Sequence, residues 1–196
     1  MIDLKKVKQE KGELINERLE QFKKVKNDND IFKELCFCLL TANFNAERAI
    51  KIQQEINDGF LTMTKEELAI KLKELGYRYP NTRAGYISEA QIKKDEILNA
   101  FKTLKEYELR EWLADNVKGL GMKESSHLLR NTGYTNSAII DFHIIDLMER
   151  EELITRPKNL NKKNYLLIED KLKNLNNNLA ELDLMLWYLE TGKILK

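Results

Sequence analysis

The segment at residues 117–123 constrains the fold of this chain more than any other. Its sequence, VKGLGMK, places Gly119 and Gly121 on either side of one apolar residue, with Lys123 two residues later. Glycines at this spacing permit a tight hairpin whose backbone can approach an anion, and a helix that starts directly afterwards points its free N–H groups at the same anion. The segment therefore predicts a turn between two helices that can hold a phosphate of a DNA backbone.

Lys123 falls in the first turn of the predicted helix, and Asp141 follows at a position typical of a helix N-cap. The positive end of the helix macrodipole disfavours a further positive charge, so the neutral and nucleophilic form of the amine is favoured there. Taken singly, such a lysine is usually solvated and such an aspartate is usually only a cap. Combined with the glycine hairpin, the pair predicts a nucleophile and a carboxylate that stabilises developing positive charge.

Helical signals run through the whole chain, which contains only two prolines and eight glycines. Thr64 and Glu67 form a capping box, and residues 35–40 are apolar on all sides, which predicts a central buried helix. The β-branched stretch at 138–140 is too short to found a sheet. The sequence therefore predicts an all-α fold, with helices near 3–26, 30–42, 45–58, 64–75, 82–103, 107–116, 122–132, 142–151, 162–175 and 179–191.

Composition limits the possible functions. The 196 residues carry a net charge of only +1, so DNA affinity must come from local arrangement. There is no long apolar run and no charged-then-apolar leader, which predicts a soluble, cytoplasmic protein without membrane contact. Cys36 and Cys38 would point about 200° apart on a helix, so we expect two buried thiols, no disulfide between them and no four-cysteine iron–sulfur cluster. His127 is interpreted as structural, and no metal site is expected.

The hairpin, Lys123 and Asp141 together resemble the helix-hairpin-helix/GPD signature of lysine-bearing DNA base-excision glycosylases. Residues 123–131 (KESSHLLRN) and 186–196 (LWYLETGKILK) are similar to the archaeal-type 8-oxoguanine DNA glycosylase/AP lyases, and the likeness runs roughly over 32–196. The resemblance implies that Lys123 attacks C1′ of the sugar, displaces 8-oxoguanine and forms a Schiff base that allows β-elimination of the strand. Asp141 would stabilise the positive charge on the sugar.

The same resemblance implies a single unit over 1–196 with two helical lobes and a cleft between them. The expected lobes are 60–140, which contains the hairpin at 117–121, and 1–59 with 141–196. Glu124, next to Lys123, would favour the charged amine unless it points away to solvent.

Four residues are candidates for the pocket of a flipped base. Leu182, Met185, Leu186 and Leu189 are expected to form the core stripe of the last helix, which leaves Trp187 and Asp183 together on a flank where they could stack on a purine and hydrogen-bond to it. Trp187 could equally pack on a neighbouring lobe. The resemblance places Tyr79 on the other face of the base. It also implies that the terminal carboxylate of Lys196 enters the pocket and accepts the N7–H that distinguishes 8-oxoguanine from guanine.

Further contacts to DNA come from the resemblance. His143 matches a position that contacts a phosphate, although it could also be a buried packing residue. Phe142 stands beside it where arginine is commoner in the family, which removes one cation. Asn43 matches the wedge that fills the gap left by the flipped base, and Arg83 matches the residue that hydrogen-bonds to the opposing cytosine. These two could instead be a helix C-cap and an ordinary surface residue.

The resulting prediction is a bifunctional enzyme that acts as a monomer on double-stranded DNA containing 8-oxoguanine, in the cytoplasm at the nucleoid. It requires no cofactor, and by resemblance the hairpin carbonyls bind a monovalent cation. The alternatives are the same chemistry on another oxidised base, and a non-catalytic helix-hairpin-helix module that only binds DNA. Such a module needs Gly119 and Gly121 but has no use for Lys123, Asp141 or Trp187.

Overall fold

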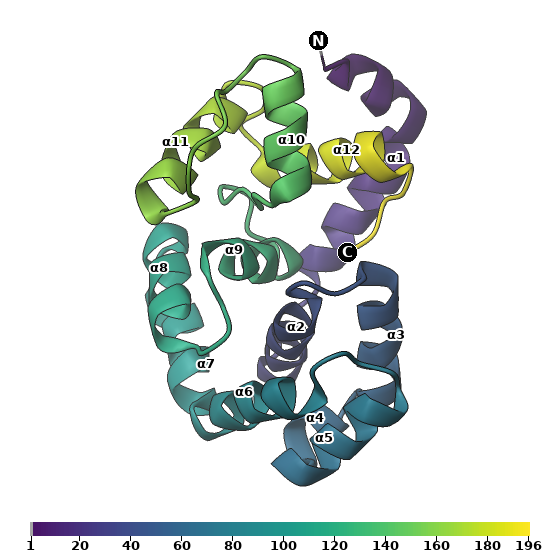
Figure 1. Cartoon of the computed structure of the whole chain (residues 1–196), viewed down its shortest axis with the longest axis vertical. Coiled ribbons are helices and arrows are strands. Elements are labelled where there is room, and N and C mark those ends of the chain that lie inside the picture. The colour runs from purple at the N-terminus through teal and green to yellow at the C-terminus, as the bar shows by residue number, and fades with distance from the viewer. Residues whose placement is uncertain (1) are drawn as a thin grey trace. The chain divides into compact units, whose positions relative to one another are not determined.

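The computed structural model describes residues 2–196, and every regular element in that range is a helix (Figure 1). The prediction of an all-α fold is therefore confirmed. The helices are α1 (Leu4–Lys23), α2 (Asp28–Thr41), α3 (Ala46–Ile56), α4 (Gly59–Thr62), α5 (Lys65–Glu74), α6 (Pro80–Ile92), α7 (Lys94–Thr103), α8 (Glu106–Asn116), α9 (Met122–Asn131), α10 (Phe142–Arg150), α11 (Lys162–Lys173) and α12 (Leu179–Thr191).

The chain divides into two compact units, whose boundaries differ from those of the expected lobes. The middle unit is residues 25–128, and the terminal unit is residues 2–24 with 129–196. Residues 25–59 belong to the middle unit because α2 packs against α3, α4, α6 and α7. Residues 129–140 belong to the terminal unit, where the backbone at 138–140 is hydrogen-bonded to side chains of α11.

Helix α2 forms the core of the middle unit. All six residues from Leu35 to Leu40 are completely buried, which confirms the central helix predicted from its apolar sequence. Cys36 and Cys38 are both free thiols in this buried stretch, as predicted. Burial in apolar surroundings raises the pKa of the Cys36 thiol well above its usual range, so this cysteine behaves as a small hydrophobic residue.

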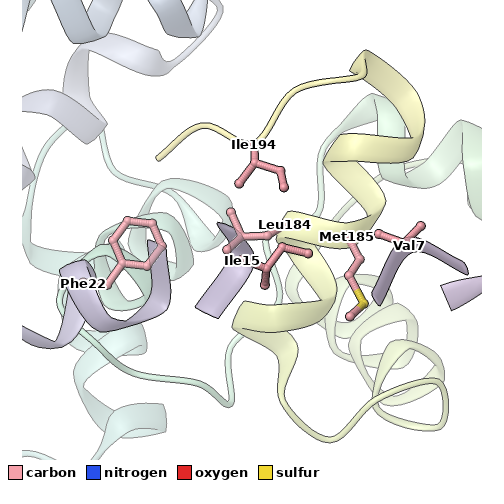
Figure 2. Close-up of a cluster of buried hydrophobic side chains, with 6 residues drawn as sticks. All are labelled: Val7, Ile15, Phe22, Leu184, Met185 and Ile194. Carbon is pink, nitrogen blue, oxygen red and sulfur yellow. The ribbon is translucent and has the colours of Figure 1, made fainter. Parts of the chain in front are cut away.

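The terminal unit is held together by its two ends. Helix α1 packs against α12, and α12 also contacts α10 and α11. Figure 2 shows the buried cluster where the chain termini meet: Val7, Ile15 and Phe22 from α1, Leu184 and Met185 from α12, and Ile194 from the tail that follows α12. The left-handed Gly192, with φ of 71°, ends α12 and its N–H bonds to the carbonyl of Tyr188. The segment after it brings Ile194 into the cluster.

Local signals set most helix ends correctly, with two exceptions in the middle unit. The capping box at the start of α5 is present, with Thr64 N–H donating to Glu67 Oε2 at 2.8 Å. The single helix expected at 82–103 is wrong, because the chain forms α6 and α7 with a break at Lys93. Lys93 leaves the helical region (φ −93°, ψ 10°) and caps both helices, and the sequence has neither glycine nor proline there to indicate it. The short helix α4 was also not predicted.

Among residues 2–196, no helix combines the length and the apolar character that crossing a bilayer requires.

Candidate active site

The glycine hairpin connects α8 to α9 in the middle unit. The N–H of Leu120 bonds to the carbonyl of Val117 at 3.1 Å, and both of these side chains are buried, so the turn is anchored from beneath. The Gly121 carbonyl accepts from the N–H of Ser125 at 2.9 Å and so begins the hydrogen-bond ladder of α9. An all-helical chain with this turn has the architecture of a helix-hairpin-helix protein.

The need for glycine differs between the two positions of the hairpin. Gly119 has φ of 95°, and a Cβ built on it would lie 2.4 Å from Tyr86 Cδ2 and 3.0 Å from Leu39 Cδ2. Only glycine fits there, because both the backbone conformation and the ring of Tyr86 exclude a side chain. Gly121 does not require a positive φ, and the only neighbour that its Cβ would meet is Glu124, whose Oε2 would lie 3.4 Å away.

Lys123 is the second residue of α9, directly after the hairpin, as predicted. Its Nζ lies 3.5 Å from Glu124 Oε1, and the two side chains are 26% and 16% exposed. Glu124 therefore faces the amine and does not point away to solvent. Further along α9, His127 is buried and packs edge-on against the ring of Phe37, with centroids 5.6 Å apart, which fits its structural interpretation.

The candidate wedge and the candidate cytosine-binding residue are linked in the middle unit. Asn43 is exposed and follows the C-cap Ala42 in a left-handed conformation with φ of 57°, so Asn43 is not itself the C-cap. Arg83 Nη2 donates to the carbonyl of Ala42 at 3.1 Å, and Arg83 Nε lies 3.3 Å from the hydroxyl of Tyr77. The alternative that Arg83 is an ordinary surface residue is therefore wrong.

Tyr77 is a supporting residue that sequence reasoning missed. It is buried, donates its hydroxyl proton to the carbonyl of Leu40 at 2.8 Å and packs against Phe44. Burial raises its pKa, and the Arg83 guanidinium opposes that shift to a smaller extent. Tyr77 therefore connects the end of α2 to α6, and its hydroxyl helps to hold the Arg83 guanidinium in place.

Tyr79 lies at the start of α6, where its ring is available to a ligand. It is the N-cap residue, half of it is exposed, and Pro80 fixes the first position of the helix. The guanidinium of Arg78 lies over the ring at 5.0 Å from its centroid, which is a cation–π contact.

Asp141 caps α10 in the terminal unit, as predicted. Its Oδ1 accepts from the N–H of Ile144 at 3.0 Å, so the carboxylate is fixed at the positive end of the helix. Two buried residues of α11 hold the extended segment in front of it. Tyr165 accepts from the N–H of Ile140 at 3.1 Å and donates to the carbonyl of Ala138 at 2.6 Å, while Glu169 accepts from the N–H of Ala138 at 2.8 Å.

His143 and Trp187 are in contact within the terminal unit. Their ring centroids are 5.9 Å apart and their planes are nearly perpendicular, at 86°. His143 is exposed, so the alternative that it is a buried packing residue is wrong. The indole Nε1 of Trp187 is buried and has no hydrogen-bond partner among residues 2–196.

The core face of α12 differs from the expected stripe. Leu182, Met185 and Leu186 are buried as predicted, but Leu189 is 41% exposed, and Leu184 is completely buried instead. Helix α12 packs against α1 and also contacts α10 and α11, so residues outside the expected stripe, such as Leu184, are buried as well.

Asp183 has a protein partner that the sequence did not reveal. Its carboxylate forms an ion pair with the guanidinium of Arg130, and the Asp183 side chain is only 11% exposed. Arg130 also donates to Asn131 Oδ1 at 2.9 and 3.1 Å and lies over the ring of Phe22. This network ties α12 to α9 and α1 within the terminal unit. Asp183 thus fixes the helix that carries Trp187.

Lys196 lies beyond Ile194, which is buried in the cluster of Figure 2. The buried isoleucine anchors the tail two residues before its last residue, and Lys196 itself is half-buried. Among the described residues, no group of three or more histidine, cysteine or acidic side chains is arranged to hold a metal ion.

Comparison with known proteins assigns the helix-hairpin-helix architecture to one family. The model of the 8-oxoguanine DNA glycosylase family matches residues 15–181. The 8-oxoguanine DNA glycosylase/AP lyase of Korarchaeum cryptofilum is 49% identical over 193 residues, which cover 94% of this chain and 91% of that protein. The relative of the same name from Methanocaldococcus jannaschii is 47% identical, and the match covers all of both chains.

Solved structures agree with this assignment. The crystal structure of the M. jannaschii 8-oxoguanine glycosylase/lyase in complex with a 15mer DNA containing 8-oxoguanine has a TM-score of 0.92 to this chain, with 45% identity and full coverage of both chains. The 8-oxoguanine DNA glycosylase of Thermotoga maritima has a TM-score of 0.92 and 42% identity, covering 99% of this chain and 97% of its own. The chain belongs to the 8-oxoguanine DNA glycosylase family.

Proposed function

We propose that this chain is a bifunctional DNA glycosylase and AP lyase that excises 8-oxoguanine from double-stranded DNA. The observation that carries the proposal is the position of Lys123, in the first turn of the helix that follows the glycine hairpin. Support comes from relatives that match nearly the whole chain and are named for this activity, one of which has been crystallised with DNA containing 8-oxoguanine.

In the proposed mechanism, the neutral amine of Lys123 attacks C1′ of the damaged nucleotide. The N-glycosidic bond breaks and its electron pair leaves with the base, so that Nζ becomes bonded to C1′. The amine loses a proton, the C1′–O4′ bond breaks with its electron pair leaving on O4′, which takes up a proton, and the opened sugar is held as a Schiff base between Nζ and C1′. Positive charge develops on the sugar as the base leaves, and the Asp141 carboxylate stabilises it. The hydrogen bond from Ile144 N–H keeps that carboxylate oriented. The Schiff base then permits β-elimination, which nicks the strand.

The remaining candidates hold the DNA and the flipped base. Trp187 and Tyr79 stack on the two faces of 8-oxoguanine, and Lys196 contributes to the pocket at the edge of the base. Asp183 contributes by fixing α12 through Arg130. The base edge is recognised by hydrogen bonds in the pocket.

The backbone contacts are proposed for the hairpin and α10. Gly119, Gly121 and His143 contact phosphates, with helix N–H groups supplying donors. Asn43 fills the gap in the duplex, and Arg83 hydrogen-bonds to the orphaned cytosine, supported by the contacts to Ala42 and Tyr77. The enzyme acts as a monomer on cytoplasmic DNA without a required cofactor, and the hairpin carbonyls bind a monovalent cation.

A trapping experiment tests the proposal. The protein is incubated with a duplex containing 8-oxoguanine in the presence of borohydride, which reduces a Schiff base to a stable covalent complex. We expect the wild type to be trapped and Lys123→Gln to give no complex. Trapping that persists in Lys123→Gln would remove this lysine from the mechanism. A panel of duplexes with other oxidised bases and a bare abasic site tests the lesion, and DNA binding without nicking by the wild type would favour the non-catalytic module.

A further inference from the structure

Glu124 is a charged residue beside Lys123 that the mechanism above leaves without a role. Neighbouring positions on an α-helix point about 100° apart, so their side chains meet only if one of them folds back. Glu124 Oε1 lies 3.5 Å from Lys123 Nζ, and Oε2 lies 3.4 Å from the position that a Cβ on Gly121 would take. The carboxylate is therefore turned toward both the amine and the hairpin.

This arrangement has a cost that the excision step does not explain. The Glu124 side chain is only 16% exposed, and removing a carboxylate from water costs free energy. Excision as proposed above uses Lys123 and Asp141 and gives Glu124 no task, so we look for its role in the step that follows.

The geometry points to Glu124 as the general base of the strand-nicking step, an inference that rests on the proposed function of Lys123. Once Nζ is bonded to C1′ of the sugar, the neighbouring carbon C2′ lies one bond further from the amine. A carboxylate beside Nζ and above the hairpin is then within reach of the hydrogen on C2′, which is the geometric requirement for a general base. The ion pair with Lys123 thus places the base for the elimination.

The step balances with the groups present. The Glu124 carboxylate takes the proton from C2′, and the C–H electron pair forms a C1′=C2′ bond as the iminium becomes an enamine. The nitrogen lone pair then re-forms the C1′=N bond, the C1′=C2′ electron pair forms a C2′=C3′ bond, and the C3′–O bond breaks with its electron pair leaving on the phosphate oxygen. The strand is cut on the 3′ side of the sugar, and the proton passes from Glu124 to water.

The experiment uses the full-length chain and separates excision from nicking. With an 8-oxoguanine duplex, strand breaks before alkali report nicking, breaks after hot alkali report all excised bases, and borohydride trapping reports the Schiff base. In Glu124→Gln, which keeps the shape but removes the base, we expect excision and trapping at wild-type rates or faster. Nicking per excised base should fall by about 100-fold or more, because a general base typically contributes at least that factor.

Two further variants complete the design. Glu124→Asp keeps a carboxylate but shortens its reach, so its nicking should lie between wild type and Glu124→Gln. Glu66→Gln makes the same substitution at an exposed position of α5 and should behave as wild type. Circular dichroism establishes that each variant is folded.

The outcomes are distinct. If Glu124→Gln nicks at the wild-type rate per excised base, Glu124 is not the base and the inference is overturned. If excision and trapping are lost together with nicking, Glu124 acts before the Schiff base and the inference is also overturned. If the wild type itself gives no trapped complex, the proposed function fails, and the inference fails with it because its substrate is the Schiff base.

Discussion

Replacing Gly119 with alanine tests the structural basis of the hairpin. At φ of 95° an alanine costs about 1–2 kcal/mol relative to an ordinary conformation. Its Cβ would also lie 2.4 Å from the ring of Tyr86, and overpacking of this kind adds about 1–3 kcal/mol. We therefore expect Gly119→Ala to lower the free energy of unfolding by about 2–5 kcal/mol.

The matched control is Gly121→Ala, two residues along the same hairpin. Its Cβ would meet only the flexible end of Glu124 at 3.4 Å, and no positive φ is required. Its cost should lie within about 0.5 kcal/mol of zero, as for an ordinary surface substitution. Urea denaturation followed by circular dichroism measures both variants.

A second substitution separates the two parts of the Gly119 penalty. Removing the ring in the double variant Gly119→Ala, Tyr86→Ala relieves the overlap but leaves the backbone strain. The double variant should therefore be more stable than the sum of the single effects predicts, by about 1–3 kcal/mol. Equal costs for Gly119→Ala and Gly121→Ala would refute the reasoning, because the hairpin would then tolerate a side chain at either position.

Three further predictions concern the supporting residues. Asp183→Asn leaves the buried guanidinium of Arg130 without its anion and should cost about 3–5 kcal/mol in urea denaturation, whereas a loss below about 1 kcal/mol would show that the pair is screened by water. Tyr165→Phe removes hydrogen bonds of 2.6 and 3.1 Å to the segment 138–140. It should cost about 1–3 kcal/mol and slow base excision in single-turnover assays, and unchanged excision would contradict a role for Tyr165 in positioning Asp141, the aspartate proposed to be catalytic. Burial raises the pKa of Tyr77, so the folded state holds this proton more tightly than the unfolded state. The free energy of unfolding should fall as pH rises above about 10, and Tyr77→Phe should show a shallower fall in the same titration.

Much of the fold could be predicted because its signals are local. The apolar stretch at 35–40 and the capping box of Thr64 and Glu67 each specify their helix without reference to distant residues. The break at Lys93 and the exposure of Leu189 could not be predicted, because no local signal in the sequence marks either of them. The spacing of apolar residues predicts the buried face of a single helix, but it does not show which residues the neighbouring helices cover.

The candidate site also contains residues that could be predicted from the sequence and residues that could not. The hairpin and the cap at Asp141 could be predicted from residue type and spacing, since glycine and N-cap preferences are local. Other residues around the site have partners that lie far away in sequence. Arg130 is 53 residues from Asp183, and Tyr165 is 25 residues from Ile140, which precedes Asp141. Only the folded chain shows that such residues hold the site in place.

The complete burial of both cysteines affects how the protein responds to oxidants. Oxidants that convert guanine to 8-oxoguanine also attack thiols, and they react with the exposed thiolate far faster than with a buried thiol. Cys36 and Cys38 are the only cysteines of the chain, and both lie in α2, out of contact with solvent. Such an oxidising stress should therefore leave both thiols of this chain intact.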